Sequence, residues 1–221
     1  MRYDTVFFRA VFFDLDGTIT DSKPGILKCI RRALDAKGVP YTQEQLDAMV
    51  GPPFRVSMRK ILGVQDAALI EEMIRIYRAD YEIEGWRDCT VYPGMEELFS
   101  RLNGAGIRLA VATSKPLKFT VMMLDALGLS RHFAFIGGAE SDSSRDSKIE
   151  VIRYVTENLG MKSSDGALMV GDRLYDIDGA KLAGMDSAGV LWGYGSEEEL
   201  TAHGADYLFS SPSELGDFLL A

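Results

Sequence analysis

Several features that mark other protein classes are scarce in this chain of 221 residues. It has only two cysteines, Cys29 and Cys89, and their separation fits neither a metal-binding pair nor a disulfide framework. We therefore expect free thiols in a reducing compartment. No apolar run approaches the roughly 18 residues that a membrane-spanning helix needs, and the N-terminus does not resemble a signal peptide. These absences favour a cytoplasmic protein with no membrane partner.

An excess of basic residues is also lacking. The chain has 24 lysines and arginines against 33 acidic residues, a net charge of −9, which disfavours nucleic acid as a partner. Apolar residues make up 47% of the sequence, and this fraction is ordinary for a globular protein. Nothing in the composition indicates an oligomeric state.

Short apolar runs alternate with helical patterns over most of the chain. Each run is short enough to be a buried strand, and each helical pattern is long enough to connect two parallel strands. This alternation predicts an α/β fold with a Rossmann-like, mostly parallel sheet. The predicted strands cover residues 6–13, 107–112, 133–136, 167–170, 187–191 and 207–209.

The region between the first and second predicted strands has a different pattern. From about residue 22 to residue 84 the apolar spacing is helical and no convincing strand occurs. We therefore predict an all-helical domain over residues 19–91. It is inserted into an α/β core domain that is formed by residues 1–18 and 92–221.

Two carboxylates follow the first predicted strand directly. Asp14 and Asp16 stand two residues apart, so in extended chain they point to the same side and can converge on one small ligand. Gly17 then lets the chain turn sharply and approach that ligand closely. Carboxylates in this setting suit a nucleophile that works beside a second carboxyl group acting as general acid and base.

Further polar residues follow other predicted strands, at the edge of the sheet where ligands bind. Asp172 comes directly after the strand at 167–170. With Asp14 and Asp16 it supplies oxygen ligands that suit a hard cation such as Mg²⁺. We therefore predict these three aspartates as metal ligands and Mg²⁺ as the cofactor.

A hydroxyl pair and a lysine complete the predicted site. Thr113 and Ser114 follow the strand at 107–112, and Lys148 begins a predicted helix. Hydroxyl and ammonium groups can bind phosphoryl oxygens and offset their charge, so we predict these three residues as phosphate-binding. The substrate is then a small phosphorylated metabolite. Lys115 is expected to be solvated rather than a ligand.

These residues resemble the motifs of the haloacid dehalogenase superfamily of phosphohydrolases. Asp14-Leu15-Asp16-Gly17-Thr18 is similar to its first motif, and Gly171-Asp172 with Asp176 is similar to its fourth. Thr113 and Lys148 stand where the second and third motifs are expected. The stretch from Asp14 to Ser22 and Gly193-Tyr194-Gly195 resemble the branch that contains phosphoglycolate phosphatases and 5′-nucleotidase-like enzymes.

The resemblance implies a role for each of these residues. Asp14 is the nucleophile that becomes an aspartyl-phosphate, and Asp16 protonates the leaving alcohol and then activates water. The backbone carbonyl of Asp16 contacts Mg²⁺, Asp172 is a metal ligand, and Asp176 orients the metal site or Lys148. The helical insertion corresponds to the cap domain. Two alternatives remain open, which are a phosphosugar mutase of the same superfamily and a non-catalytic module that senses phosphate esters.

Overall fold

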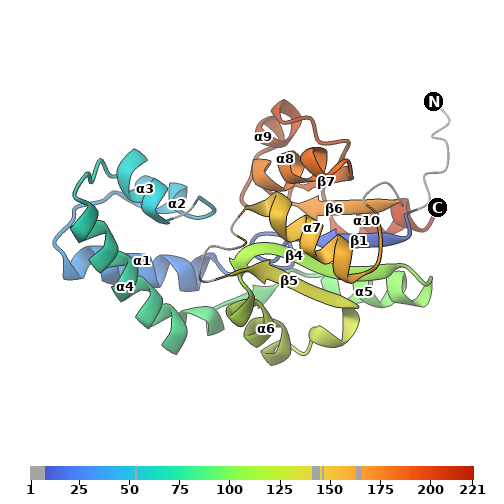
Figure 1. Ribbon diagram of the computed structural model, residues 1–221, viewed down its shortest axis with the longest axis horizontal. Helices are drawn as coiled ribbons and strands as arrows, with labels where there is room; N and C mark the ends of the chain where they lie inside the picture. The colour runs from blue at the N-terminus through green and yellow to red at the C-terminus, as the bar shows by residue number, and fades with distance from the viewer. Residues whose placement is uncertain (1–7, 53, 141–144, 146, 163–165) are drawn as a thin grey trace. The chain divides into compact units, whose positions relative to one another are not determined.

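A parallel sheet forms the centre of the larger part of the molecule (Figure 1). The computed structural model describes residues 8–52, 54–140, 145, 147–162 and 166–221. In this part of the chain the six strands of the sheet are ordered β5-β4-β1-β6-β7-β8, and neighbours pair in parallel. They are β1 (Ala10–Phe13), β4 (Arg108–Pro116), β5 (Phe135–Ala139), β6 (Ala167–Gly171), β7 (Asp186–Val190) and β8 (Tyr207–Phe209). The predicted α/β class is confirmed. Residues 6 and 7 of the first predicted strand lie outside the described residues.

The central strand β1 is buried on both faces. Phe12 packs in a core cluster with Val151 and Ile152, and Phe13 meets Phe99 edge to face with ring centroids 5.3 Å apart. Because helices cover both faces, every residue of β1 is apolar and the sequence reads as a continuous run rather than an alternating one. This packing fixes the strand whose carboxyl end carries Asp14.

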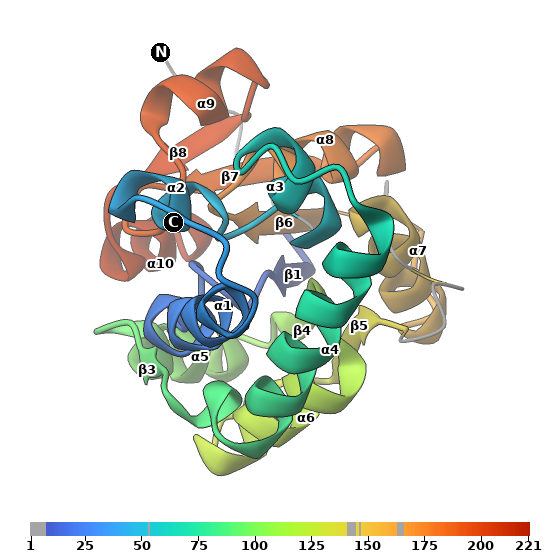
Figure 2. The ribbon, with the colours of Figure 1, turned by 90° about the vertical axis from the view of Figure 1, so that its left-hand side faces the viewer.

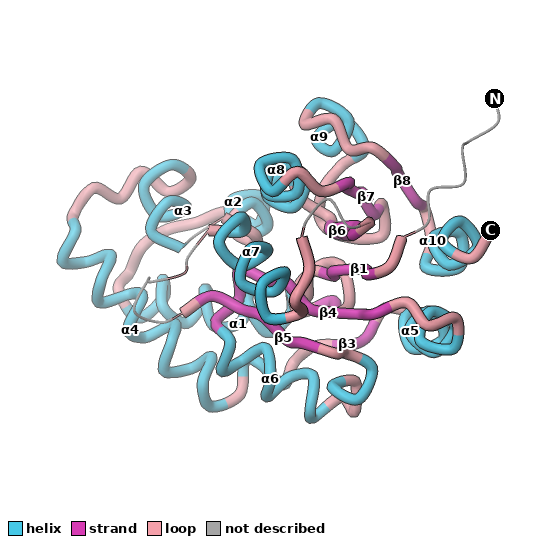
Figure 3. Tube along the Cα trace, turned by 45° about the vertical axis from the view of Figure 1, so that its right-hand side comes forward, coloured by secondary structure: helices cyan, strands magenta, loops and turns pink. Residues whose placement is uncertain are grey.

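Helices lie on both sides of the strand layer in this unit (Figure 3). Helices α7 and α8 pack against each other and against strands of the sheet, and α5 packs against α10. The helix α9 was not predicted from the sequence. The helices of this unit are α5 (Met95–Gly104), α6 (Leu117–Ala126), η2 (Ser130–His132), α7 (Lys148–Asn158), α8 (Leu174–Ala183), α9 (Glu197–Ala202) and α10 (Pro212–Leu219).

The chain divides into two compact units. Residues 1–20 and 91–221 form the unit with the parallel sheet, and residues 21–90 form a smaller helical unit. In the smaller unit α1 and α4 pack side by side (Figure 2). Its helices are α1 (Lys23–Ala36), α2 (Gln43–Ala48), α3 (Phe54–Lys60), α4 (Ala67–Ile83) and the 3₁₀ turn η1 (Gly85–Arg87). Two short strands that were not predicted, β2 (Thr20–Asp21) and β3 (Thr90–Val91), pair where the chain passes between the units.

Candidate active site

Asp14 lies directly after the carboxyl end of β1. Its backbone N–H donates to the carbonyl of Val170 at 2.9 Å, and Phe13 is in register with Val170 of β6. The neighbouring strand β6 therefore ends beside β1, and Asp172 after it lies close to Asp14 in space. The polar residues that the sequence places after separate strands thus meet at one edge of the sheet, where parallel sheets bind ligands.

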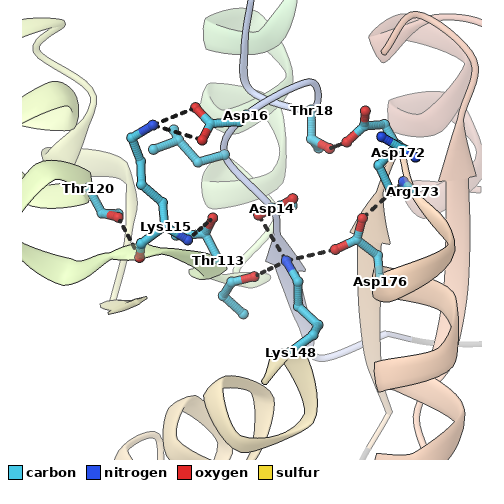
Figure 4. A network of polar contacts seen from close by, with 12 residues as sticks. Asp14, Asp16, Thr18, Thr113, Lys115, Thr120, Lys148, Asp172, Arg173 and Asp176 are labelled. Atoms are coloured by element: carbon cyan, nitrogen blue, oxygen red, sulfur yellow. Dashed lines mark hydrogen bonds and ion pairs between the residues drawn. The ribbon is translucent and has the colours of Figure 1, made fainter. Parts of the chain in front are cut away.

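Lys148 is buried between two of these carboxylates (Figure 4). Its Nζ lies 2.9 Å from Asp14 Oδ1 and 2.7 Å from Asp176 Oδ1, and it donates to the carbonyl of Ala112 at 3.0 Å. Burial pulls the pKa of Lys148 down, but the charges of Asp14 and Asp176 outweigh it, so the pKa lies above its ordinary value. A permanent positive charge therefore stands beside Asp14.

Three carboxylates gather around this point. Oxygens of Asp14, Asp172 and Asp176 all lie within 4.8 Å of one another. Burial, followed by the charges of Asp176 and Asp14, raises the pKa of Asp172 to about 8. Burial likewise raises the pKa of Asp176 to about 6, although Lys148 opposes this shift. A cluster of buried oxygens whose negative charge is only partly neutralised fits a hard divalent cation such as Mg²⁺.

The carboxylate of Asp16 is held apart from this cluster. Both of its oxygens accept from Lys115 Nζ, at 2.9 and 2.7 Å. The expectation that Lys115 is solvated was wrong, because only 9% of this residue is exposed. The physical reason is the length of β4, which continues to Pro116 and carries Lys115 into the sheet two residues beyond Thr113. The structure thus brings together Asp14, Asp172 and Asp176, while the Asp16 side chain forms a separate ion pair.

The predicted hydroxyl pair is divided between two environments. Thr113 is buried, and its Oγ1 accepts from the backbone N–H of Lys115 at 3.2 Å. Ser114 is exposed. Thr113 therefore lies buried at the carboxyl end of β4, and Ser114 is exposed next to it.

Two residues that were not predicted as site residues, Thr18 and Tyr194, support Asp172. Thr18 Oγ1 donates to Asp172 Oδ1 at 3.2 Å, and the N–H of Tyr194 donates to Asp172 Oδ2 at 2.8 Å. Gly17 adopts a φ of +85°, and a Cβ at that position would lie 2.2 Å from Asp172 Oδ2. The available signal was the glycine on either side of Tyr194, which allows the backbone to approach so closely.

Arg173 has a structural partner rather than a free head group. Its Nε donates to Glu199 Oε1 at 2.8 Å, and the same oxygen accepts from the N–H of Leu174 at 2.9 Å. This pair links the start of α8 to α9. The sequence offers no local signal for it, since the two residues are 26 positions apart.

Comparison with known proteins decides the family. A sequence model of the haloacid dehalogenase-like hydrolase family matches residues 11–190. The chain belongs to this family. The match covers the first strand, the helical unit and the strands up to β7, so this haloacid dehalogenase-like hydrolase has all the elements that carry the predicted site.

Individual relatives of this hydrolase carry different names. A 5′-nucleotidase from Pseudomonas aeruginosa is 36% identical over 204 residues, which cover 92% of this chain and 91% of the relative. The tyrosine-protein kinase PtkA from Mycobacterium tuberculosis is 42% identical over 186 residues, which cover 84% of this chain. The match covers only 62% of PtkA, so this chain spans less than two thirds of that relative's length.

Solved structures agree with this placement. The crystal structure of a predicted phosphatase from Clostridium acetobutylicum has a TM-score of 0.90 and 38% sequence identity, and the match covers 97% of this chain and 99% of that chain. Among the described residues, no helix is both long enough and apolar enough to cross a bilayer.

Proposed function

We propose that this hydrolase is a Mg²⁺-dependent phosphatase that acts on a small phosphate monoester through an aspartyl-phosphate on Asp14. The observation that carries the proposal is the position of Lys148, whose ammonium group lies 2.9 Å from Asp14 within a cluster of three carboxylates. An anionic nucleophile needs such compensation before it can approach a phosphoryl dianion.

In the proposed first step, an Asp14 oxygen attacks phosphorus and the bond from phosphorus to the ester oxygen breaks. Asp16, once it has left its ion pair with Lys115 and is protonated, gives its proton to the departing alkoxide. Lys148 offsets charge on Asp14 and the phosphoryl oxygens. Thr113 donates to a phosphoryl oxygen. In the second step Asp16 removes a proton from water, which attacks phosphorus and releases Asp14. Asp176 holds Lys148 in place through their contact at 2.7 Å.

Asp14 and Asp172, with the backbone carbonyl of Asp16, are the proposed metal ligands. When bound there, Mg²⁺ supplies positive charge that stabilises the transferring phosphoryl group. The support for this assignment is the chemistry of the donors, which are oxygens of the kind this cation prefers. The raised pKa of Asp172 also supports a cation at this site, because a buried carboxylate without enough positive charge nearby retains its proton.

The names of the relatives indicate the substrate class, and the helical unit is the part proposed to select the substrate. Relatives named 5′-nucleotidase and phosphoglycolate phosphatase suggest a small phosphorylated metabolite. We assign residues 21–90 the role of a cap that selects the substrate, as the resemblance implies. Neither Cys29 nor Cys89 forms a disulfide, and we propose a cytoplasmic location for the enzyme.

The name of the relative PtkA suggests a second candidate function, which is transfer of a phosphoryl group to a protein tyrosine. Aspartyl-phosphate chemistry would also serve the mutase, in which the acceptor is a sugar rather than water. The final acceptor of the phosphoryl group therefore distinguishes these functions. In both the phosphatase and the mutase, Asp14 would accept the phosphoryl group first.

The test is phosphate release by the purified protein with Mg²⁺ across phosphoglycolate, nucleoside monophosphates, pyrophosphate and sugar phosphates, with Asp14→Asn in parallel. We expect Mg²⁺-dependent release from one class, lost in the variant. An isomerised sugar phosphate would favour the mutase. Incorporation from labelled ATP into tyrosine, without phosphate release from any ester, would favour the kinase. Tight ester binding with no turnover would favour the sensor.

A further inference from the structure

The loop that follows β7 encloses the carboxylate of Asp172. In this loop the N–H of Tyr194 donates to Asp172 Oδ2 at 2.8 Å. The indole N–H of Trp192 donates to the carbonyl of Thr18 at 3.0 Å, and the hydroxyl of Thr18 donates to the other oxygen, Asp172 Oδ1, at 3.2 Å. Each oxygen of the carboxylate therefore has one donor, and the loop supplies or supports both.

The two glycines of the loop make this approach possible. A Cβ at Gly193 would lie 2.3 Å from both Asp172 Cβ and the carbonyl oxygen of Gly17, and one at Gly195 would lie 1.9 Å from the carbonyl oxygen of Asp172. No side chain fits at these distances, and the atoms in the way include the backbone oxygens of Gly17 and Asp172. The loop is therefore in contact with both chain segments that carry metal-binding aspartates.

We propose that residues 192–195 form a positioning element that holds Asp172 in the orientation needed to bind the metal. The inference rests on the proposed metal site and adds residues that lie outside it. A carboxylate with a donor on each oxygen has little rotational freedom, so it meets the cation already oriented. Partners that orient a ligand in this way typically change metal affinity by about 10–100-fold when they are removed.

The test measures Mn²⁺ binding to the full chain by calorimetry and by electron paramagnetic resonance, independently of turnover. We expect Gly193→Ala and Gly195→Ala to weaken Mn²⁺ binding by about 10–100-fold. Trp192→Phe, which removes the indole N–H that donates to Thr18 and shortens the ring but leaves the loop backbone unchanged, should weaken it by about 10-fold. Gly104→Ala is the matched control, because a Cβ at Gly104 meets nothing within 4 Å. Its Mn²⁺ affinity should stay within about twofold of the parent protein.

The outcomes separate this inference from the proposed function. If the parent protein binds no Mn²⁺, the metal site itself is wrong. If it binds Mn²⁺ and all three loop variants bind equally well, the positioning element is overturned. Should a glycine variant fail to fold, Trp192→Phe decides the question, since it inserts no atom at the Asp172 backbone. A lower melting temperature with unchanged Mn²⁺ affinity would mean a structural role only and would also overturn the inference.

Discussion

Lys148 connects the stability of this protein to its chemistry. Its ammonium group contacts Asp14 and Asp176 and donates to a backbone carbonyl, while only 6% of the residue is exposed. An unpaired charge buried this deeply would destabilise the fold, so Lys148 needs its carboxylate partners and they need Lys148. One side chain therefore neutralises both acids and, in the proposed mechanism, prepares Asp14 as the nucleophile.

Replacing Lys148 with Met should damage both properties. We expect kcat to fall by about 10²–10³-fold, because the charge beside the nucleophile is lost. The metal-free protein should lose about 3–5 kcal/mol of stability, because the buried carboxylate of Asp176 and the partly buried carboxylate of Asp14 lose their partner. Steady-state kinetics and chemical denaturation measure the two effects. Lys60→Met, at an exposed position of α3, is the control and should change neither. An unchanged kcat in Lys148→Met would contradict the assigned role.

Asp16 should matter only for substrates whose leaving group needs a proton. Asp16→Asn should lower phosphoenzyme formation from an alkyl phosphate by about 10²–10⁴-fold. With a nitrophenyl phosphate the loss should be far smaller, since nitrophenolate leaves without protonation. The two rates are compared by rapid quench. Asp14→Asn should abolish both reactions alike. Equal losses with both substrates in Asp16→Asn would exclude its role as general acid.

The sequence predicts that Asp14 and Asp172 lie close together, but it does not predict the partners of the candidate site residues. The spacing of Asp14 and Asp16 after an apolar run is a local signal, and strand ends that meet at one edge bring in Asp172 by topology alone. The ion pair between Lys115 and Asp16 spans 99 positions, and it depends on where β4 ends. Strand ends are the least certain part of a sequence-based prediction, so the contact was missed.

Helix α7 places Lys148 at its first residue. Ser147 caps this helix by accepting from the N–H of Glu150, and Glu150 in turn accepts from the N–H of Ser147. These two bonds satisfy backbone donors that the first turn leaves unpaired. The cap therefore fixes the start of the helix from which Lys148 reaches Asp14.

Ser147→Ala should cost about 1 kcal/mol of stability and also reduce kcat severalfold, because the first turn of α7 carries Lys148. Ser211→Ala is the matched control: Ser211 caps α10 in the same way by accepting from the N–H of Glu214. It should show a similar loss of stability with kcat unchanged. Denaturation curves and kcat are measured on both variants. A kcat that changes equally in both would show that the effect is global.

Helix caps in the sequence predicted the start of some helices, but not of all of them. Thr42 with Gln45 indicates a capping box, and the structure confirms it at the start of α2. The short helix α9 was missed although Ser196 caps it. Its six residues EEELTA contain one buried side chain, so there is no apolar stripe to detect.

The stability of the whole molecule should depend on pH in a direction set by the buried acids. In the folded protein the pKa of Asp172 is raised to about 8, above the unfolded value of about 3.9. Between these two pKa values the folded state therefore binds more protons than the unfolded state. The stability of the metal-free protein falls as pH rises toward 8 and levels off above it. The raised pKa of Asp176 acts in the same direction up to about pH 6.

We expect the metal-free protein to lose about 1–2 kcal/mol between pH 6.5 and pH 8.5. This window lies above the range in which the lowered pKa of His132 gives an opposite trend. Asp172→Asn should remove most of the slope. The proposed Mg²⁺ ion would bind the ionised carboxylate, so the stabilisation that it adds should grow with pH across the same window. Melting temperatures with EDTA and with Mg²⁺ measure both trends. A slope that survives Asp172→Asn would assign it to another group.

The central claim is that phosphoryl transfer passes through Asp14. The most direct test is to mix the Asp16→Asn variant with a nitrophenyl phosphate and Mg²⁺, quench in acid and map the phosphorylated peptide by mass spectrometry. In this variant formation of the intermediate needs no proton donor, while its hydrolysis lacks the base. Our account predicts that one phosphoryl group accumulates on Asp14, and that the additional change Asp14→Asn abolishes it. Turnover by the parent protein with no phosphoryl group on Asp14 in the variant would contradict the account.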